Sequence, residues 1–111
     1  MDILEARYGE AVLLTINGRL DSVTSPTLEQ KLLAFISGNV RQFILNFSAM
    51  EYISSAGLRI LLMAAKKLKP VEGVMVLCGL QDHVREVFDL AGFSPLFPIY
   101  DSQEAALKHL T

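Results

Sequence analysis

The sequence contains only one cysteine, Cys78, in 111 residues. A disulfide within the chain is therefore excluded, and so is a zinc site built from cysteines. The two histidines, His83 and His109, are far apart in the sequence and lack the spacing of a metal-ligand pair. We therefore expect no metal site and no cofactor. Cys78 lies in an apolar run and is expected to belong to the core.

The chain also lacks a concentration of charge of one sign. Ten Lys and Arg residues against twelve Asp and Glu residues give a formal net charge of −2. Nucleic-acid binding needs a concentrated basic surface, so no direct nucleic-acid partner is expected. No apolar run approaches the ~20 residues that a membrane span requires, and the acidic N-terminus has no signal-peptide profile. We expect a soluble, cytoplasmic protein without direct membrane insertion.

Sequence motifs of enzymes with α/β folds are missing as well. There is no G-x-G-x-x-G and no P-loop. Residues 54–57, SSAG, are not a nucleophile elbow, which needs a glycine on each side of the serine. A catalytic triad would have to use His83, at a predicted helix start, or His109, near the end of the sequence, as its base. We therefore expect a protein that acts by binding and is not an enzyme.

What the sequence does contain is a series of apolar runs typical of strands. Hydrophobic residues make up 51% and charged residues 20%, which is typical of one globular domain. Residues 10–17 are nearly continuous in apolar side chains, as in a strand covered on both faces, whereas residues 2–7 alternate and are expected at an edge. Strands are predicted at 2–7 and 10–17, joined by a hairpin turn, and at 43–47, 74–78 and 96–100.

Helices are predicted between these strands, and the order of elements is β-β-α-β-α-β-α-β-α. The first helix is predicted to start at Ser25 and to end at Gly38, and the second to start at Ser54 or Ser55 and to end before Pro70. A short third helix ends at Gly92, and a capping box at 101–104 opens the last helix. This alternation predicts one α/β domain with right-handed crossovers. Its sheet is expected to be mixed and mostly parallel, with four to five strands and about four helices.

Two adjacent serines, Ser54 and Ser55, stand at the predicted start of the second helix. A serine there usually serves as an N-cap that accepts hydrogen bonds from free backbone N–H groups, and one serine is sufficient for that role. The alternative is a phosphoacceptor, because helix N-termini favour anions. A phosphate adds roughly −1.5 to −2 charge, and a partner docked over it would meet an unpaired, desolvated charge. From the residues alone, the role of N-cap is favoured, and the role of a phosphoacceptor that controls binding stays open.

Residues 44–59, ILNFSAMEYISSAGLR, resemble the signature of STAS domains (sulphate transporter and anti-sigma factor antagonist). They are most similar to stand-alone bacterial anti-sigma factor antagonists. Residues 18–21, GRLD, resemble the family's strand-end motif before its first helix, and residues 88–93, FDLAGF, resemble its late helix and turn. Residues 99–105 match its closing join of strand and helix. The resemblance covers the whole chain and implies a single STAS-type domain over residues 1–111.

In that family the phosphoacceptor is the serine two places before the glycine, which here is Ser55. The resemblance implies a partner switch. The unphosphorylated antagonist binds an anti-sigma factor that is also a serine kinase, phosphorylation with ATP dissociates the complex, and a metal-dependent serine phosphatase restores it. The chain departs from the family at Asn46 and Ser54, where many relatives carry aspartate. Both departures are expected to remove negative charge near Ser55, and Ser54 becomes a second candidate acceptor.

The resemblance also implies a partner-binding face around the acceptor and on the loop after the strand 10–17. Asp21 is either a contact or only a turn residue. Met50 is expected in an exposed turn as an adaptable contact, while Tyr52 and Ile53 are expected to fold inward. Arg59, one turn into the helix from Ser55, is either solvated or contacts the partner or the phosphate. The candidate partner-binding residues are Asp21, Ser22, Thr24, Met50, Ser54, Ser55, Ala56, Gly57 and Arg59.

A second class of function stays open at this stage. STAS domains also occur as subunits of ABC-type lipid transport complexes, where the same face binds an ATPase without phosphorylation. A neighbouring gene for a histidine-kinase-like serine kinase would favour the partner switch, and neighbouring ABC transporter genes would favour the transport subunit.

Overall fold

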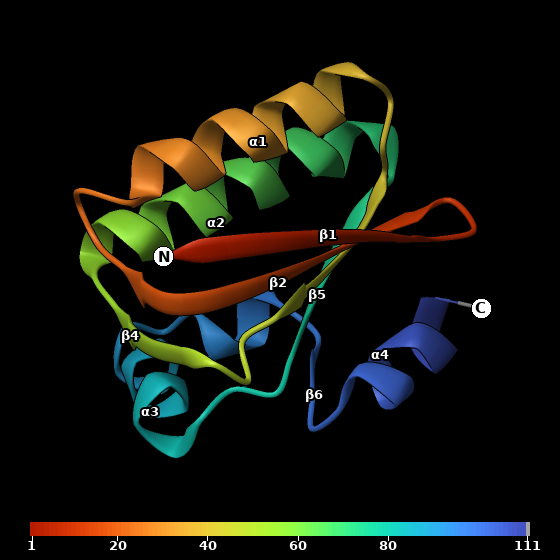
Figure 1. The fold of residues 1–111 in the computed structure, drawn as a ribbon. Coiled ribbons are helices and arrows are strands. Elements are labelled where there is room, and N and C mark those ends of the chain that lie inside the picture. The colour runs from red at the N-terminus through yellow and green to blue at the C-terminus, as the bar shows by residue number, and fades with distance from the viewer. Residues whose placement is uncertain (111) are drawn as a thin grey trace.

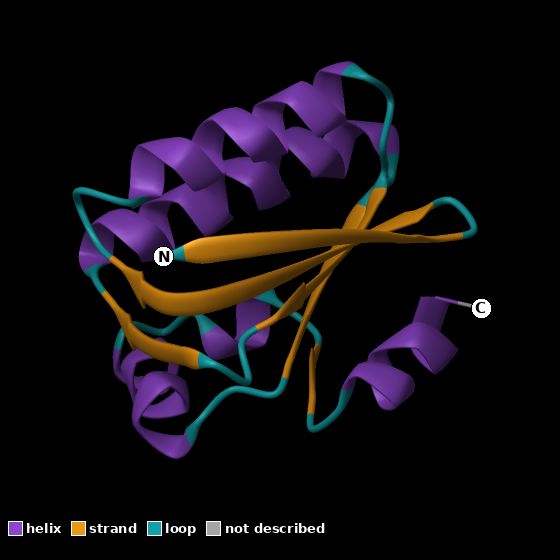
Figure 2. Ribbon diagram, viewed as in Figure 1, coloured by secondary structure: helices purple, strands orange, loops and turns teal. Residues whose placement is uncertain are grey.

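The computed structural model describes residues 1–110, so Thr111, the last residue of the expected domain, lies outside the described residues. Its six strands form one twisted sheet with helices on both faces (Figures 1 and 2). The strands are β1 (Asp2–Tyr8), β2 (Ala11–Leu20), β3 (Gln42–Asn46), β4 (Met50–Ile53), β5 (Val74–Cys78) and β6 (Ile99–Tyr100).

The helices follow the predicted order. They are α1 (Ser25–Ser37), α2 (Ser55–Leu68), α3 (Asp82–Leu90) and α4 (Gln103–Leu110), with two short 3-10 turns, η1 (Lys69–Val71) and η2 (Ser94–Leu96). Ser25 was expected to cap α1, but Thr24 holds the cap position and Ser25 already lies in the first turn. Within residues 1–110, no helix has both the length and the apolar character needed to cross a membrane.

The sheet runs in the order β1-β2-β3-β5-β6, and its strand directions match the prediction. β1 is an edge strand that pairs antiparallel with β2 through a tight turn at Gly9, whose φ of 59° suits a glycine. The other pairs are parallel. β2 is long enough to pair with β1 on one side and with β3 and then β4 on the other. Among the described strands, β2 therefore has the most neighbours, whereas β3 stands in the middle of the order.

β4 is a strand that the sequence did not reveal. After β3 the chain turns, with the Met50 N–H donating to the Phe47 carbonyl at 2.9 Å, and then pairs with Gly18–Leu20 of β2. This pairing lays Met50, which has no exposed surface, and Ile53, which is 2% exposed, against the core. The exposed turn expected around Met50 is therefore wrong. Tyr52, expected to fold inward, is 39% exposed.

The sheet separates two clusters of buried side chains. Val12 and Leu14 of β2 belong to the larger cluster, with the apolar sides of α1, α2 and α3. Leu13 and Ile44 belong to the smaller cluster, with Ala106 of α4. Figure 1 shows α1 and α2 on one side of the sheet and α4 on the other. Because successive strand side chains point to opposite faces, β2 needs apolar residues along most of its length. This confirms the two-sided covering expected from the sequence.

Gly57, in the first turn of α2, marks a very close approach between this helix and the sheet. A Cβ atom at this position would lie 2.9 Å from Cγ1 of Ile53 and 2.9 Å from Cγ of Leu20. Leu20 ends β2 and Ile53 ends β4. Only a residue without a side chain therefore allows the start of α2 to pack directly on both strand ends. A side chain at this position would therefore crowd two core side chains, Leu20 and Ile53.

Replacing Gly57 by Val is expected to lower the free energy of unfolding by about 1–3 kcal/mol, the usual cost of overpacking a core. The gain in helix propensity from Gly to Val is only a few tenths of a kcal/mol, so the steric cost dominates. Urea denaturation followed by circular dichroism measures the change. Gly38→Val is the matched control, because a Cβ there has its nearest neighbours at 3.5 Å. Equal stability of the two variants would show that the first turn of α2 has room for a side chain.

Candidate functional site

Ser54 and Ser55 have different positions at the start of α2. Ser54 is the N-cap, with extended backbone, and its Oγ accepts a hydrogen bond from the Gly57 N–H at 3.4 Å. Ser55 is the first helical residue and is exposed. Among the described residues, its hydroxyl has no hydrogen-bond partner. The capping role that the sequence assigned to one of the two serines belongs to Ser54, so the Ser55 hydroxyl is free for another role.

Backbone hydrogen bonds attach this cap to the end of β2. The Ser54 N–H donates to the Leu20 carbonyl at 2.9 Å, and the Leu58 N–H donates to the Ser54 carbonyl at 3.0 Å. Ser55 is therefore presented by a rigid junction between the sheet and a helix of 14 residues. It does not lie on a flexible loop.

The loop after β2 is folded by its own side chains. Asp21 Oδ1 accepts hydrogen bonds from the N–H groups of Val23 at 3.0 Å and Thr24 at 3.1 Å. Thr24 Oγ1 accepts from the Asp21 N–H at 2.9 Å and donates to the Arg19 carbonyl at 2.9 Å. The backbone hydrogen bond from Thr24 is the main cause that lowers the pKa of Asp21, so its carboxylate is charged at neutral pH. Asp21 therefore has the turn-forming role that the sequence left open.

Three of the predicted contact residues meet at a shallow hollow between the first turns of α1 and α2. The hollow has a volume of about 370 Å³, and Ser22, Ala56 and Arg59 line it together with Ile60 and other side chains of the two helices. Ser22 and Arg59 are exposed, and Ala56 is half-buried. The loop after β2 and the start of α2 thus form one surface. We call residues 21–24, 54–56 and Arg59 the N-terminal face.

Two of the predicted contact residues are not on this surface. Met50 is fully buried in the core, so its expected contact with a partner is withdrawn. Gly57 is also buried, and it acts through the close packing of α2 on Leu20 and Ile53.

The structure adds residues that sequence reasoning missed. Val23 is 82% exposed at the tip of the loop after β2. On the neighbouring strand ends, the Arg19 guanidinium lies 4.2 Å from the centre of the Tyr52 ring, a cation–π contact. Val23 could have been found as an apolar residue within the polar run 22–25. The pair of Arg19 and Tyr52 could not, because it depends on the pairing of β4 with β2.

The side chain of Asn46 forms two hydrogen bonds. Its Nδ2 donates to Gln103 Oε1 at 3.0 Å, and its Oδ1 accepts from the Ser48 N–H at 2.9 Å. Gln103 begins α4, which packs on the side of the sheet opposite α2 (Figure 1). Asn46 is therefore held by Gln103 of α4 and by the Ser48 N–H. That it lowers the negative charge near Ser55 stays a prediction. An aspartate at this position could still accept from Ser48 but could not donate to Gln103.

Two further candidate residues, Cys78 and His83, lie outside the N-terminal face and make contacts within the fold. Within residues 1–110, no group of three or more His, Cys, Asp or Glu residues could hold a metal ion. Cys78 is buried, and desolvation raises the pKa of its thiol to about 11. His83 Nε2 lies 2.6 Å from the Glu51 carbonyl oxygen, so this contact ties α3 to β4.

Comparison with known proteins gives related chains of similar length. The candidate anti-sigma factor antagonist BtrV of Bordetella bronchiseptica is 42% identical over 95 residues, which cover 86% of this chain and 82% of that protein. The anti-sigma F factor antagonist of Paenibacillus polymyxa is 26% identical and covers 96% and 93% of the two chains. The crystal structure of an anti-sigma factor antagonist from Mycobacterium paratuberculosis superimposes with a TM-score of 0.88 at 27% identity, over 97% of this chain and 92% of that one.

The sequence pattern of a whole family matches as well. The pattern described as the STAS domain covers residues 3–106, which include the six strands except Asp2 of β1, and the junction that presents Ser55. Together with the 42% identity to the Bordetella protein, this match shows that the chain belongs to the STAS domain family.

Proposed function

We propose that this protein is an anti-sigma factor antagonist that binds its partner through the N-terminal face and is released when Ser55 is phosphorylated. The observation that carries the proposal is the exposed Ser55 hydroxyl in the first turn of α2, next to a serine that already serves as the cap. Relatives named as anti-sigma factor antagonists, 42% and 26% identical, support the class of partner. Their names favour this role over that of an ABC-type transport subunit.

The proposed partner is an anti-sigma factor that is also a serine kinase. The N-terminal face has the mixed character of a protein–protein interface, with an exposed apolar side chain among polar ones. Val23 is 82% exposed and would be the apolar anchor. The Asp21 carboxylate and the Arg59 guanidinium would lie around it, with Ser22 and Thr24 as further polar contacts. We assign no catalytic group to this chain.

The switch requires two reactions, both carried out by other proteins in the cytoplasm. The kinase transfers the γ-phosphoryl group of ATP to Ser55 Oγ. A bond forms between Oγ and the γ-phosphorus, the bond from that phosphorus to the oxygen of ADP breaks, and the serine loses its proton. A metal-dependent serine phosphatase then hydrolyses the phosphate ester, which releases inorganic phosphate and restores the hydroxyl.

Phosphorylation would stop binding without unfolding the helix. The first N–H groups of α2 and its dipole favour a negative charge at this end. The phosphate adds roughly −1.5 to −2 charge to a neutral side chain. A partner seated over Ser55 would have to desolvate that charge without pairing it, which costs several kcal/mol. The charge therefore weakens the complex while the fold persists.

The site of modification can be identified by labelling with radioactive ATP and the serine kinase that is recovered with this protein from its native host. We expect label on the wild type and on Ser54→Ala, because Ser55 carries the exposed hydroxyl, and none on Ser55→Ala. Mass spectrometry of the labelled peptide confirms the position. Label that persists in Ser55→Ala and disappears in Ser54→Ala would move the acceptor to Ser54.

A fixed negative charge at Ser55 is expected to imitate the phosphate in part. Ser55→Asp should weaken the complex with the anti-sigma factor more than tenfold, which is ~1.4 kcal/mol. Isothermal titration calorimetry measures the affinity. Ser37→Asp is the matched control, because it adds the same charge at an exposed serine at the far end of α1, outside the N-terminal face, and it should change the affinity less than threefold. Unchanged binding by Ser55→Asp would rule out the charge mechanism.

A further inference from the structure

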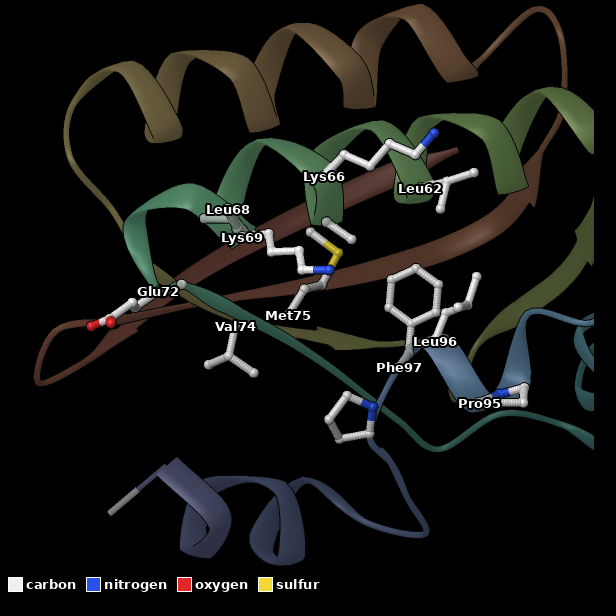
Figure 3. Close-up of a pocket in the computed structure, with 13 residues that line it drawn as sticks. Leu62, Lys66, Leu68, Lys69, Glu72, Val74, Met75, Pro95, Leu96 and Phe97 are labelled. Atoms are coloured by element: carbon white, nitrogen blue, oxygen red, sulfur yellow. The ribbon is translucent and has the colours of Figure 1, made fainter.

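A hollow lined mostly by apolar side chains lies at the opposite end of α2 from Ser55. It has a volume of about 580 Å³, within the range of small-molecule sites. Its walls come from the second half of α2, the start of β5, and the segment that joins η2 to β6 (Figure 3). Since an α-helix rises about 1.5 Å per residue, the hollow extends along α2 from Leu62, roughly 10 Å from Ser55, to Lys69, roughly 20 Å from it.

The floor of this hollow is part of the core. Leu68, Met75 and Phe97 line it, and they are only 1%, 4% and 4% exposed. Leu96 stands at the rim and is 52% exposed. Figure 3 shows Leu96 and Phe97 on one side of the hollow and Lys69 with Met75 on the other. A ligand in the hollow would therefore touch apolar side chains on two sides.

The hollow exists because the last strand is short. β6 has two residues and pairs with Leu77 and Cys78 at the end of β5. The preceding segment, with Pro95 and Pro98, reaches that strand from the 3-10 turn η2 and lies across from α2. Proline has no backbone N–H, so this segment cannot continue a regular ladder along the start of β5. A gap between α2 and η2 is the result.

Two cations border this apolar space. Lys66 and Lys69 line the hollow and are exposed. Within the described part of the chain, neither ammonium group forms an ion pair. Glu72 also lines the hollow, but Figure 3 shows its carboxylate turned away from the other side chains. The border of the hollow therefore carries positive charge, although the whole chain has a formal net charge of −2.

Cations in the last turn of a helix also complement the helix dipole. That role explains lysines at this end of α2, and Lys67, which does not line the hollow, would fulfil it equally. It does not explain why two of them border an open apolar surface with an exposed leucine on its rim. The combination of an apolar floor and unpaired cations at the border fits a ligand with an apolar tail and one negative head group.

We propose that this hollow binds an amphiphilic carboxylate, such as a medium-chain fatty acid. The apolar tail lies on Met75, Phe97 and Leu96, and the carboxylate pairs with Lys69 and Lys66. The proposal does not rest on phosphorylation of Ser55 or on the anti-sigma factor, because the two sites lie at opposite ends of α2. Either can be disproved without the other.

The test uses the purified wild-type chain and decanoate below its critical micelle concentration, followed by NMR of backbone amides. We expect saturable shifts confined to the residues around the hollow. Decyltrimethylammonium, which has the same tail and a positive head group, should bind at least tenfold more weakly. The double variant Lys66→Gln with Lys69→Gln should weaken decanoate binding at least tenfold. Lys67→Gln is the matched control and should bind decanoate as the wild type does.

Several results would overturn the proposal. These are non-saturable or scattered shifts, equal binding of the two amphiphiles, and an equal loss of affinity in Lys67→Gln and the double variant. Binding only to vesicles of anionic lipid, or only to an acidic peptide, without binding of decanoate, would likewise show that the hollow is not a site for this class of ligand. Thermal unfolding of each variant shows whether a loss of binding reflects a loss of fold.

Discussion

The close packing of the first turn of α2 on the ends of β2 and β4 is the contact on which the candidate site depends. It is possible because Gly57 has no side chain and leaves room for Leu20 and Ile53. The same junction fixes the Ser54 cap through its hydrogen bond to the Leu20 carbonyl. With the cap role filled by Ser54, the next hydroxyl is presented outward. The close packing at Gly57 thus holds the junction at which Ser54 caps the helix and the Ser55 side chain is exposed.

This arrangement suits a binding switch because recognition and control occupy one rigid surface. The loop after β2 is stiffened by the hydrogen bonds of Asp21 and Thr24, so little conformational entropy would be lost when a partner docks. A helix N-terminus tolerates an added negative charge, whereas a buried interface does not. Under the proposed function, a phosphate at Ser55 would therefore change the affinity for the partner more than the stability of the domain. The hollow at the other end of α2 is separate from this surface and leaves room for a second ligand.

Much of the fold could be predicted because its central strands are covered on both faces and read as continuous apolar runs, as in residues 11–16 and 74–78. The start and stop signals of α2 were equally readable, whereas the cap of α1 was predicted one residue too late, at Ser25 in place of Thr24. β4 was not, because its four residues are ordered by pairing with Gly18–Leu20, about thirty residues earlier in the chain, and carry no periodic signal. Because β4 was not predicted, the exposure predicted for Met50 and Tyr52 was wrong. The contact of Asn46 with Gln103 was hidden for the same reason, since it joins residues 57 positions apart.

In the proposed switch, charge at Ser55, and not a change of fold, controls binding. The most direct measurement compares the affinity of the anti-sigma factor for this protein carrying phosphate on Ser55 with its affinity for the same sample after phosphatase treatment, at one salt concentration. Backbone amide spectra of both forms are recorded alongside. The account predicts at least tenfold weaker binding of the phosphorylated form, with spectral changes limited to the N-terminal face. Equal affinity of the two forms, or a loss of affinity accompanied by loss of helix α2, would contradict it.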